Sequence, residues 1–245
     1  MMRSDYHHLE SVDSTQTFSK KNVSSFDRDA FTVVTSEEQS NGRGRLNRHW
    51  YSPKGSNLYT TYCFTLPEMP HSSNPITLVL ALSISEVLQK LGLSVQIKWP
   101  NDLYIQSKKM GGILAEVVSE KDTKQAFLGF GLNVNLTADA LNTQEFEGTS
   151  LLIETKRQWD LKTLAASIET TFKRDLEIFI QKGFLPFQKS FEGISFFHGK
   201  TIRLDVGNEV LSGSYQGVNE DGALLLKLPN SEIKAFLSGE IIGWE

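Results

Sequence analysis

Cysteine is nearly absent from this 245-residue chain, in which Cys63 is the single example. One thiol cannot form an intrachain disulfide or supply a cysteine-ligated metal cluster, and this usage favours a cytoplasmic setting. Cys63 lies within a strand-like run of apolar and β-branched residues, so we expect a small buried side chain there and not a nucleophile. The histidines show no ligand spacing, and no metal-ligating residues are predicted.

Long apolar runs are also lacking. Residues 1–8 do not contain the apolar segment of a signal peptide. The most apolar window, residues 76–91, is interrupted by Ser83, Glu86 and Lys90. We therefore predict a buried helix in this window, and we expect no membrane partner.

The third absence is a surplus of basic residues, since the formal net charge is −4. A protein that acts mainly on nucleic-acid backbones usually carries a positive surplus. Hydrophobic residues make up 39% of the chain and charged residues 22%, as in a globular protein with a substantial core. This length accommodates one large domain, alone or with a small companion.

Helical and strand-like segments alternate irregularly through the first part of the chain. Asn74-Pro75 predicts the start of one helix and Gly92 its end. Asp160 is the predicted cap of a second helix, whose apolar residues recur at three- and four-residue steps as far as Gly183. Strands are predicted over residues 31–35, 57–66, 95–99 and 127–134.

The character of the sequence changes near residue 194. Five short strand-like runs follow, over residues 201–206, 209–211, 214–218, 223–228 and 233–236, and turn signals such as Asp221-Gly222 separate them. Short strands at this spacing predict a small β-barrel. We therefore divide the chain into a larger domain, residues 1–193, and a β module, residues 194–245.

A polar loop containing Gly42-Arg43-Gly44-Arg45 follows the first predicted strand. The glycines let the backbone close on a ligand, and the arginines present planar donor groups that suit carboxylate or phosphate. A solvated turn or a nucleic-acid-binding patch would contain the same residues, so the loop by itself leaves these alternatives open.

A second group begins at Lys98-Trp99-Pro100-Asn101-Asp102 and continues from Lys109 to Gly112. Most lysines in turns are simply solvated, but Lys109 leads directly into an apolar run, which would aim its ammonium group at the mouth of the sheet, where it suits a phosphate oxygen. Asp102 is either an ordinary turn residue or a group that binds Mg²⁺ or accepts a proton from an attacking amine.

A third segment, Asp13-Ser14-Thr15-Gln16, is predicted to open a short helix. Helix capping alone would explain Ser14 or Thr15. The same hydroxyl and N–H groups could hold a ureido ring or a carboxylate.

Together and in this order, these segments resemble the catalytic region of bacterial biotin protein ligases, and the resemblance extends over nearly the whole chain. It implies an α+β fold in which helices flank a mixed β-sheet, as in class II aminoacyl-tRNA synthetases and biotin ligases, followed by an SH3-like C-terminal β-barrel. The matching stretches are residues 13–15, 39–45, 50–53, 55–59, 98–103, 109–114, 129–135, 222–226 and 239–241.

The resemblance also implies a reaction. Biotin would be activated with ATP as biotinoyl-5′-AMP and transferred to a specific lysine of a biotin carboxyl carrier domain, with Mg²⁺ as the counterion of ATP. The positions that match contacts to biotin or its adenylate are Ser14, Thr15, Gln16, Gln39, Arg43, Gly44, Arg45, Lys109 and Gly112. The nucleotide positions are Trp50, Asn101 and Asn133, and the catalytic candidates are Lys109, Arg45 and Asp102.

The chain departs from the family pattern in two places. Leu46 and Asn47 occupy the last two positions of the usual Gly-Arg-Gly-Arg-Arg-Gly loop, although asparagine tolerates a positive φ better than most residues. Only about ten residues precede Ser11, too few for the winged helix-turn-helix of bifunctional members, so neither repressor activity nor DNA binding is expected. A homodimer formed through exposed sheet edges is physically plausible.

Two other functions would use some of the same residues. A lipoate or octanoate ligase or transferase would have a similar fold and similar residues near Lys109, but the Gly-Arg-Gly-Arg loop favours biotin. A non-catalytic nucleic-acid-binding module would use Arg43, Arg45 and Arg48, and the acidic net charge disfavours it.

Overall fold

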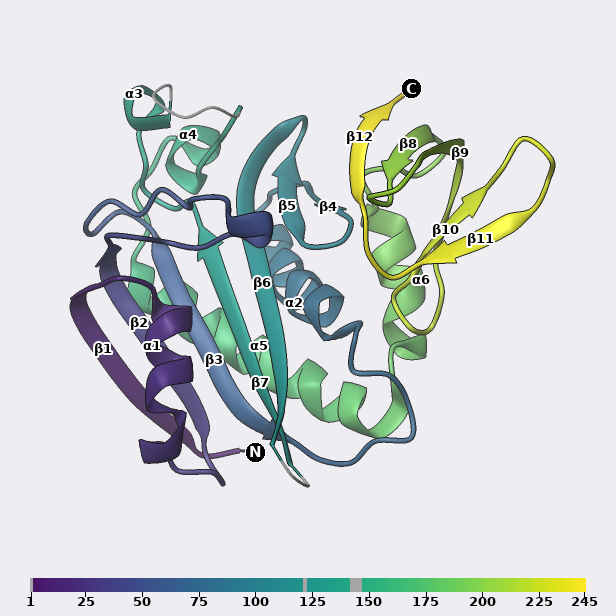
Figure 1. Cartoon of the computed structure of the whole chain (residues 1–245). Coiled ribbons are helices and arrows are strands. Elements are labelled where there is room, and N and C mark those ends of the chain that lie inside the picture. The colour runs from purple at the N-terminus through teal and green to yellow at the C-terminus, as the bar shows by residue number, and fades with distance from the viewer. Residues whose placement is uncertain (1, 121–122, 142–146) are drawn as a thin grey trace.

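A seven-stranded mixed β-sheet forms the centre of the larger domain in this computed structural model, which describes residues 2–120, 123–141 and 147–245 (Figure 1). The strand order is β1-β2-β3-β7-β6-β5-β4, and only the β1–β2 pair is parallel. The bounds are β1 Ser4–Val12, β2 Phe31–Gln39, β3 Leu58–Leu66, β4 Val95–Lys98, β5 Asp102–Ile105, β6 Lys108–Glu120 and β7 Thr123–Leu132.

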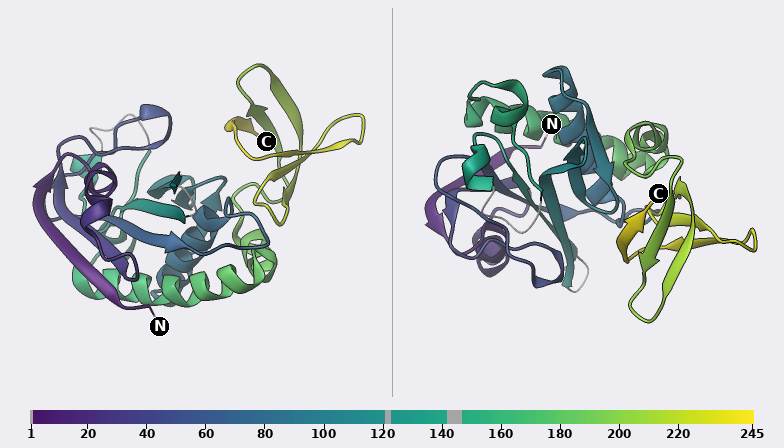
Figure 2. Two further views of the ribbon diagram at one scale, coloured as in Figure 1. Left: turned by 60° about the horizontal axis from the view of Figure 1, so that its bottom comes forward. Right: turned by 90° about the horizontal axis from the view of Figure 1, so that it is seen from above.

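Helices cover the two faces of this sheet unequally. Helices α2 (Ile76–Lys90) and α5 (Leu161–Lys182) lie on one face of the sheet (Figure 2). On this face Tyr62 of β3 stacks on Phe172 of α5, with 5.5 Å between ring centroids. The short helix α1 (Thr15–Asn22) lies on the other face, against β2, β3 and β7. Alternate β3 side chains therefore enter different cores. Cys63 is buried, as predicted, and lies on the α1 side.

The C-terminal module is a five-stranded antiparallel sheet in the order β11-β10-β9-β8-β12. Its strands are β8 Thr201–Asp205, β9 Val210–Val218, β10 Leu224–Lys227, β11 Ile233–Phe236 and β12 Glu240–Trp244. Helix α6 (Leu185–Ile194) leads into it, so the predicted boundary near residue 194 falls at the last residue of this helix. The Trp99 indole N–H donates to the Gly222 carbonyl at 3.0 Å and ties the module to the larger domain.

The smaller helical elements are α3 (Ala138–Leu141), α4 (Leu151–Thr155) and the 3₁₀ turns η1 (Val23–Ser25) and η2 (Arg45–Asn47). None of the helices in the described part of the chain is long and apolar enough to cross a membrane.

The two long helices lie where their sequence patterns place them. The Asp160 side chain accepts a hydrogen bond from the Thr163 amide at 2.8 Å, and Gly183 ends the helix with φ of 66°. The start of α2 differs in detail from the prediction: Pro75 occupies the cap position and no side chain caps the helix. The predicted Asn74 cap is therefore wrong, although the element and its length are right.

Several strands differ from the predicted ones. The runs predicted over residues 209–211 and 214–218 form one strand, β9, while β1, β5 and β12 were not predicted at all. Residues 36–39, expected in a loop, extend β2 because Ser36 and Gln39 pair with Leu9 and Val12 of β1. Pairing with distant residues supplies the hydrogen bonds that local composition does not indicate.

Candidate active site

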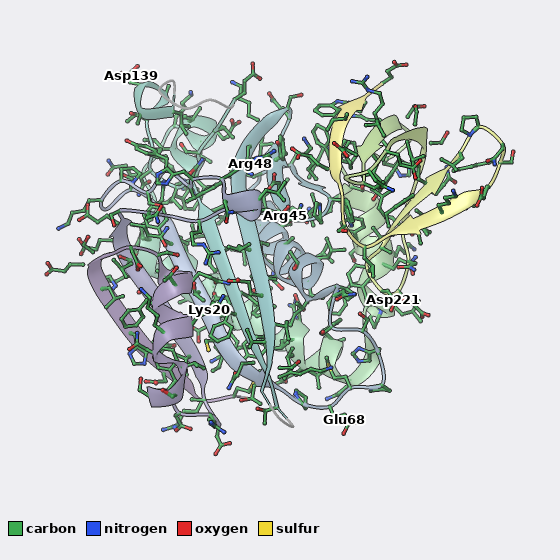
Figure 3. All side chains as sticks on the ribbon, viewed as in Figure 1. Lys20, Arg45, Arg48, Glu68, Asp139 and Asp221 are labelled. Carbon is green, nitrogen blue, oxygen red and sulfur yellow. The ribbon has the colours of Figure 1, made fainter. Side chains whose placement is uncertain are left out.

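A cavity of about 400 Å³ opens on the α1 face of the central sheet. It is lined by the start of α1, the loop after β2, the segment between β4 and β5, and the facing parts of β6 and β7. Gly239, Glu240 and Ile241 of the C-terminal module complete the wall. Both domains therefore build this site, and Arg45 and Arg48 lie between them (Figure 3).

Glycines of β6 and β7 form the floor of the cavity. A Cβ atom at Gly131 would lie 2.2 Å from Nε1 of Trp50, and one at Gly129 would lie 2.5 Å from Oε1 of Gln16. Gly112 pairs with Gly131 across the two strands and lies under the same indole ring. Only glycine, which has no Cβ atom, leaves room at these positions for the side chains of Trp50 and Gln16.

One end of the cavity carries neutral hydrogen-bonding groups. Ser14 caps α1 by accepting from the Thr17 amide at 3.4 Å, which is the structural role that the sequence allowed for it. The amide oxygen of Gln39 accepts from the Thr15 backbone N–H at 2.9 Å and from its hydroxyl at 3.2 Å. The Gln39 amide nitrogen donates to the Ser52 hydroxyl at 2.9 Å, so its orientation is fixed on both sides.

The other end is charged. Lys109, near the start of β6, forms an ion pair with Asp102, the first residue of β5, at 2.8 Å, and each of the two side chains is 21% exposed. The Lys109 ammonium group also lies 5.5 Å from the centre of the Trp50 ring. The two catalytic candidates that the sequence placed seven positions apart are therefore in direct contact.

Two further cations lie at this end. Burial lowers the pKa of Arg45, and the carboxylates of Asp102 and Glu240 oppose that shift. Burial likewise lowers the pKa of Lys98, whose ammonium group lies 4.6 Å from the centre of the Trp244 ring. Desolvated cations gain more from an anionic ligand than solvated ones do, so this end suits carboxylate and phosphate groups.

The loop between β2 and β3 folds back over the cavity. The Gly44 amide donates to the Arg48 carbonyl and the Trp50 amide to the Gly42 carbonyl, both at 2.8 Å. Leu46 at the tip has φ of 54°, and Asn47, as the sequence suggested, also takes a positive φ, 58°. Left-handed backbone is unfavourable for leucine, so this tip adopts a conformation that glycine would take more easily.

The same loop is fastened to the C-terminal module. Arg45 donates to the Asn101 side-chain oxygen at 3.1 Å and to the Gly239 carbonyl at 3.4 Å. Arg48 forms an ion pair with Glu240 at 2.5 Å. The arginines that might have formed a nucleic-acid patch thus point to the cavity and to the neighbouring domain.

All of the site residues predicted from the sequence line this cavity except Asn133. Asn133 is buried behind the wall, where its amide nitrogen donates to the Thr149 carbonyl at 3.1 Å and its amide oxygen accepts from Asn57 at 3.4 Å. The sequence did not single out Lys98 or Glu240 as site residues. Lys98 belongs to a recognised motif, whereas Glu240 is brought in from the other domain and carries no local signal.

No cluster of three or more His, Cys, Asp or Glu side chains able to hold a metal ion occurs among the described residues. The carboxylates that line the cavity are Asp102 and Glu240, and each of them is paired with a cation.

The fold and the cavity define a class of protein: an α+β domain built on a mixed sheet, whose site is completed by a small SH3-like β module. The model of the biotin/lipoate A/B protein ligase family matches residues 8–133, and that of the biotin protein ligase C-terminal domain matches residues 197–243. The chain belongs to the biotin/lipoate A/B protein ligase family.

Named relatives agree with this assignment. The bifunctional ligase/repressor BirA of Escherichia coli is 35% identical over 207 residues, which cover 84% of this chain and 64% of that protein. The biotin–[acetyl-CoA-carboxylase] ligase of Paracoccus denitrificans is 28% identical over 210 residues and is covered to 84%. The chain therefore spans slightly less than two thirds of the first relative's length.

A solved structure matches along the whole chain. The biotin protein ligase from Aquifex aeolicus in complex with biotin and ATP superposes with a TM-score of 0.81 and 30% sequence identity, and 98% of each chain is covered.

Proposed function

We propose that this protein is an ATP-dependent biotin protein ligase, which forms biotinoyl-5′-AMP and transfers the biotinoyl group to a lysine of a carboxyl carrier domain. The observation that carries the proposal is the cavity itself, which has a neutral polar end at Thr15 and Gln39 and a cationic end at Lys109, Arg45 and Lys98. The structures of ligases with biotin and ATP support the same substrates.

Biotin has the matching polarity. Its ureido ring is neutral and both donates and accepts hydrogen bonds, whereas the far end of its chain is a carboxylate. Buried donors and acceptors lose free energy when they are left unpaired, so a ureido ring suits the neutral end better than the dithiolane of lipoate or the alkyl chain of octanoate. The carboxylate would then lie at the cationic end.

In the first step a carboxylate oxygen of biotin attacks the α-phosphorus of ATP and the bond to pyrophosphate breaks. Negative charge increases where these groups meet, and Lys109 and Arg45 are placed to stabilise it. Mg²⁺ would enter with ATP as its counterion and offset charge on the phosphates. Trp50, over Gly131, offers an aromatic surface for the adenine.

The product of this step is a mixed anhydride that water destroys. The loop of residues 42–48 lies over the cavity, and its contacts with Asn101, Gly239 and Glu240 hold it there. Arg45 therefore serves two roles, as a cation in the first step and as part of the lid that excludes water afterwards.

In the second step the neutral amine of the carrier lysine attacks the acyl carbon, and AMP leaves with the bonding electrons. Asp102 is our candidate for accepting the proton that the amine loses. Its carboxylate faces the cavity from the start of β5, and it is free to accept a proton once Lys109 turns to the phosphate.

The test is to incubate the protein with ATP and, in separate reactions, biotin, lipoate or octanoate, and to detect the acyl-AMP by mass spectrometry. We expect biotinoyl-AMP and, after a biotin carboxyl carrier domain is added, a single acylated lysine. An adenylate of lipoate or octanoate in place of biotin would contradict the proposal, as would salt-dependent nucleic-acid binding without any adenylate.

Two further points complete the proposal. We propose a cytoplasmic location, which the need of the proposed reaction for ATP and a carboxylase carrier supports. Strand β1 is an edge strand of the central sheet, and no other described strand pairs with its outer edge. We propose that a homodimer would form through this edge.

A further inference from the structure

Gln16 lies at the neutral end of the cavity. The nitrogen and the oxygen of its side-chain amide have different hydrogen-bonding neighbours. Its nitrogen, Nε2, faces three oxygen acceptors: the Phe127 carbonyl at 3.1 Å, the Leu114 carbonyl at 3.3 Å and the Glu116 carboxylate at 3.0 Å. Its oxygen, Oε1, lies over the backbone of Gly129 and accepts from the Thr61 hydroxyl at 3.3 Å.

This arrangement excludes the flipped amide. Exchanging the two atoms would place Oε1 against three acceptors, one of them a carboxylate, and would leave those acceptors without the amide protons. Gln16 is only 3% exposed, so water cannot compensate for the loss. The site therefore offers the ligand a hydrogen-bond acceptor at this position and not a donor.

The carboxylate of Glu116 is itself held in place. Lys20, in the last turn of α1, forms an ion pair with its other oxygen at 2.9 Å. Partial burial would raise the pKa of Glu116, but the hydrogen bonds from Lys20 and Gln16 and the nearby charge of Arg43 outweigh burial, and the pKa is lowered. The carboxylate is thus ionised at neutral pH and remains an acceptor.

We propose that Glu116 and Lys20 act as a positioning pair that fixes the Gln16 amide with its oxygen toward the ligand, so that Gln16 selects for a ring N–H. Resting on the proposed function, this inference names the group that Gln16 recognises, one ureido N–H of biotin. The four polar groups Lys20, Glu116, Gln16 and the ureido N–H would form one continuous hydrogen-bonded chain from the surface to the substrate.

The test uses two biotin analogues in which oxygen replaces one or the other ureido nitrogen. Each is compared with biotin by calorimetric binding and by pyrophosphate release. The unaltered protein should bind at least one analogue about 10- to 100-fold more weakly than biotin, because an oxygen would then face Oε1 of Gln16. We call this ratio the N–H discrimination.

The decisive variant exchanges the charges of the pair, Lys20→Glu with Glu116→Lys. It keeps an ion pair at this place but puts a donor where Glu116 accepted from Gln16. Only the Phe127 and Leu114 carbonyls then oppose the flipped amide, so its population should rise. We expect the N–H discrimination to fall about tenfold, with the KM for biotin raised and the KM for ATP unchanged. If the pair served stability alone, the exchange would leave the discrimination as it was, and that result would overturn the proposal.

Three single variants complete the design. Glu116→Gln keeps an acceptor and should keep most of the discrimination, while Glu116→Met removes it and should reduce the discrimination at least about threefold. If the protein with the exchanged pair does not fold, Glu116→Met becomes the deciding variant. An unchanged N–H discrimination in Glu116→Met would then overturn the proposal. Lys21→Met is the matched control, because Lys21 is on the same helix but pairs with Asp13 at 3.5 Å, and it should change nothing.

The wild-type measurements separate the two proposals. An unaltered protein that binds no biotin would refute the proposed function and this inference together. An unaltered protein that binds biotin while the exchanged pair retains full discrimination would refute the positioning role of Glu116 and Lys20 alone.

Discussion

Replacing Lys109 with methionine removes the cation at the centre of the charged end and keeps a side chain of similar length. The backbone would hold its place, since the Lys109 amide donates to the Glu147 carbonyl and its carbonyl accepts from the Thr149 amide, both at 2.9 Å. The ion pair with Asp102 is lost, but partly exposed pairs contribute only about 1 kcal/mol or less to stability. The variant should therefore fold.

The effect on adenylation should be large for two reasons. Lys109 would no longer stabilise the charge that develops around the α-phosphate, and loss of one such group typically costs about 100- to 1000-fold in kcat. The Asp102 carboxylate, left without its partner at 2.8 Å, would also repel the incoming anions. We expect pyrophosphate release to fall by at least about 100-fold, with the melting temperature within a few degrees of the original.

Single-turnover pyrophosphate release with saturating biotin and ATP measures this rate directly. The double variant Lys109→Met with Asp102→Asn separates the two causes, because it removes the repelling carboxylate as well. We expect it to recover part of the lost rate without approaching the original. A Lys109→Met protein that adenylates biotin within tenfold of the original rate would refute the role given to this lysine.

Three other perturbations address the lid and the floor. Arg45→Gly removes a cation and the contacts to Asn101 and Gly239, so it should slow adenylate formation and release the biotinoyl-AMP that still forms, seen as biotinylation of bystander lysines; tight retention of the adenylate would contradict the role of Arg45 in the lid. Glu240→Gln weakens the tie to Arg48 and should produce the same release more mildly, about two- to fivefold. Gly131→Ala places a Cβ 2.2 Å from Trp50 and should raise the KM for ATP about tenfold or more.

Matched changes control for effects on folding. Gly193→Ala lies in α6, where the added Cβ would meet no atom of another element within 4 Å, so it should leave activity unchanged and slightly raise the melting temperature. An unchanged KM for ATP in Gly131→Ala would show that Trp50 does not form the adenine surface. Equal release of adenylate by the original protein and Glu240→Gln would show that the ion pair between Arg48 and Glu240 does not hold the lid.

Much of the site was open to prediction because its residues lie in short segments with strong local character. The Gly-Arg loop, the segment from Lys98 to Asp102 and the strand that begins at Lys108 each carry their chemistry within a few residues. Asn133 shows the limit of such reasoning. Its side chain lies outside the cavity lining and joins Asn57 to the backbone at Thr149, contacts with residues 76 and 16 positions away, and its assignment to the nucleotide stays a prediction.

Elements of weak local character could not be found in this way. Strand β1 is rich in polar side chains and owes its conformation to the ladder that it forms with β2. The contribution of Glu240 depends on how the C-terminal module docks, which is set by contacts such as that of Trp99 with Gly222. Neither composition nor hydrophobic periodicity predicts how two domains of one chain pack against each other.

The sequence by itself determined which chemical groups are present and the local structures that carry them: the capped helices, the glycines of the strands, and an arginine loop in a chain with little cysteine and no basic surplus. Only the tertiary structure decided how those groups combine. It brought Lys109 into contact with Asp102, placed Glu116 within hydrogen-bonding distance of Gln16, and completed the cavity wall with residues of the second domain. The physical reason is that hydrogen bonds and ion pairs act over a few ångströms, and folding alone sets which distant residues come that close.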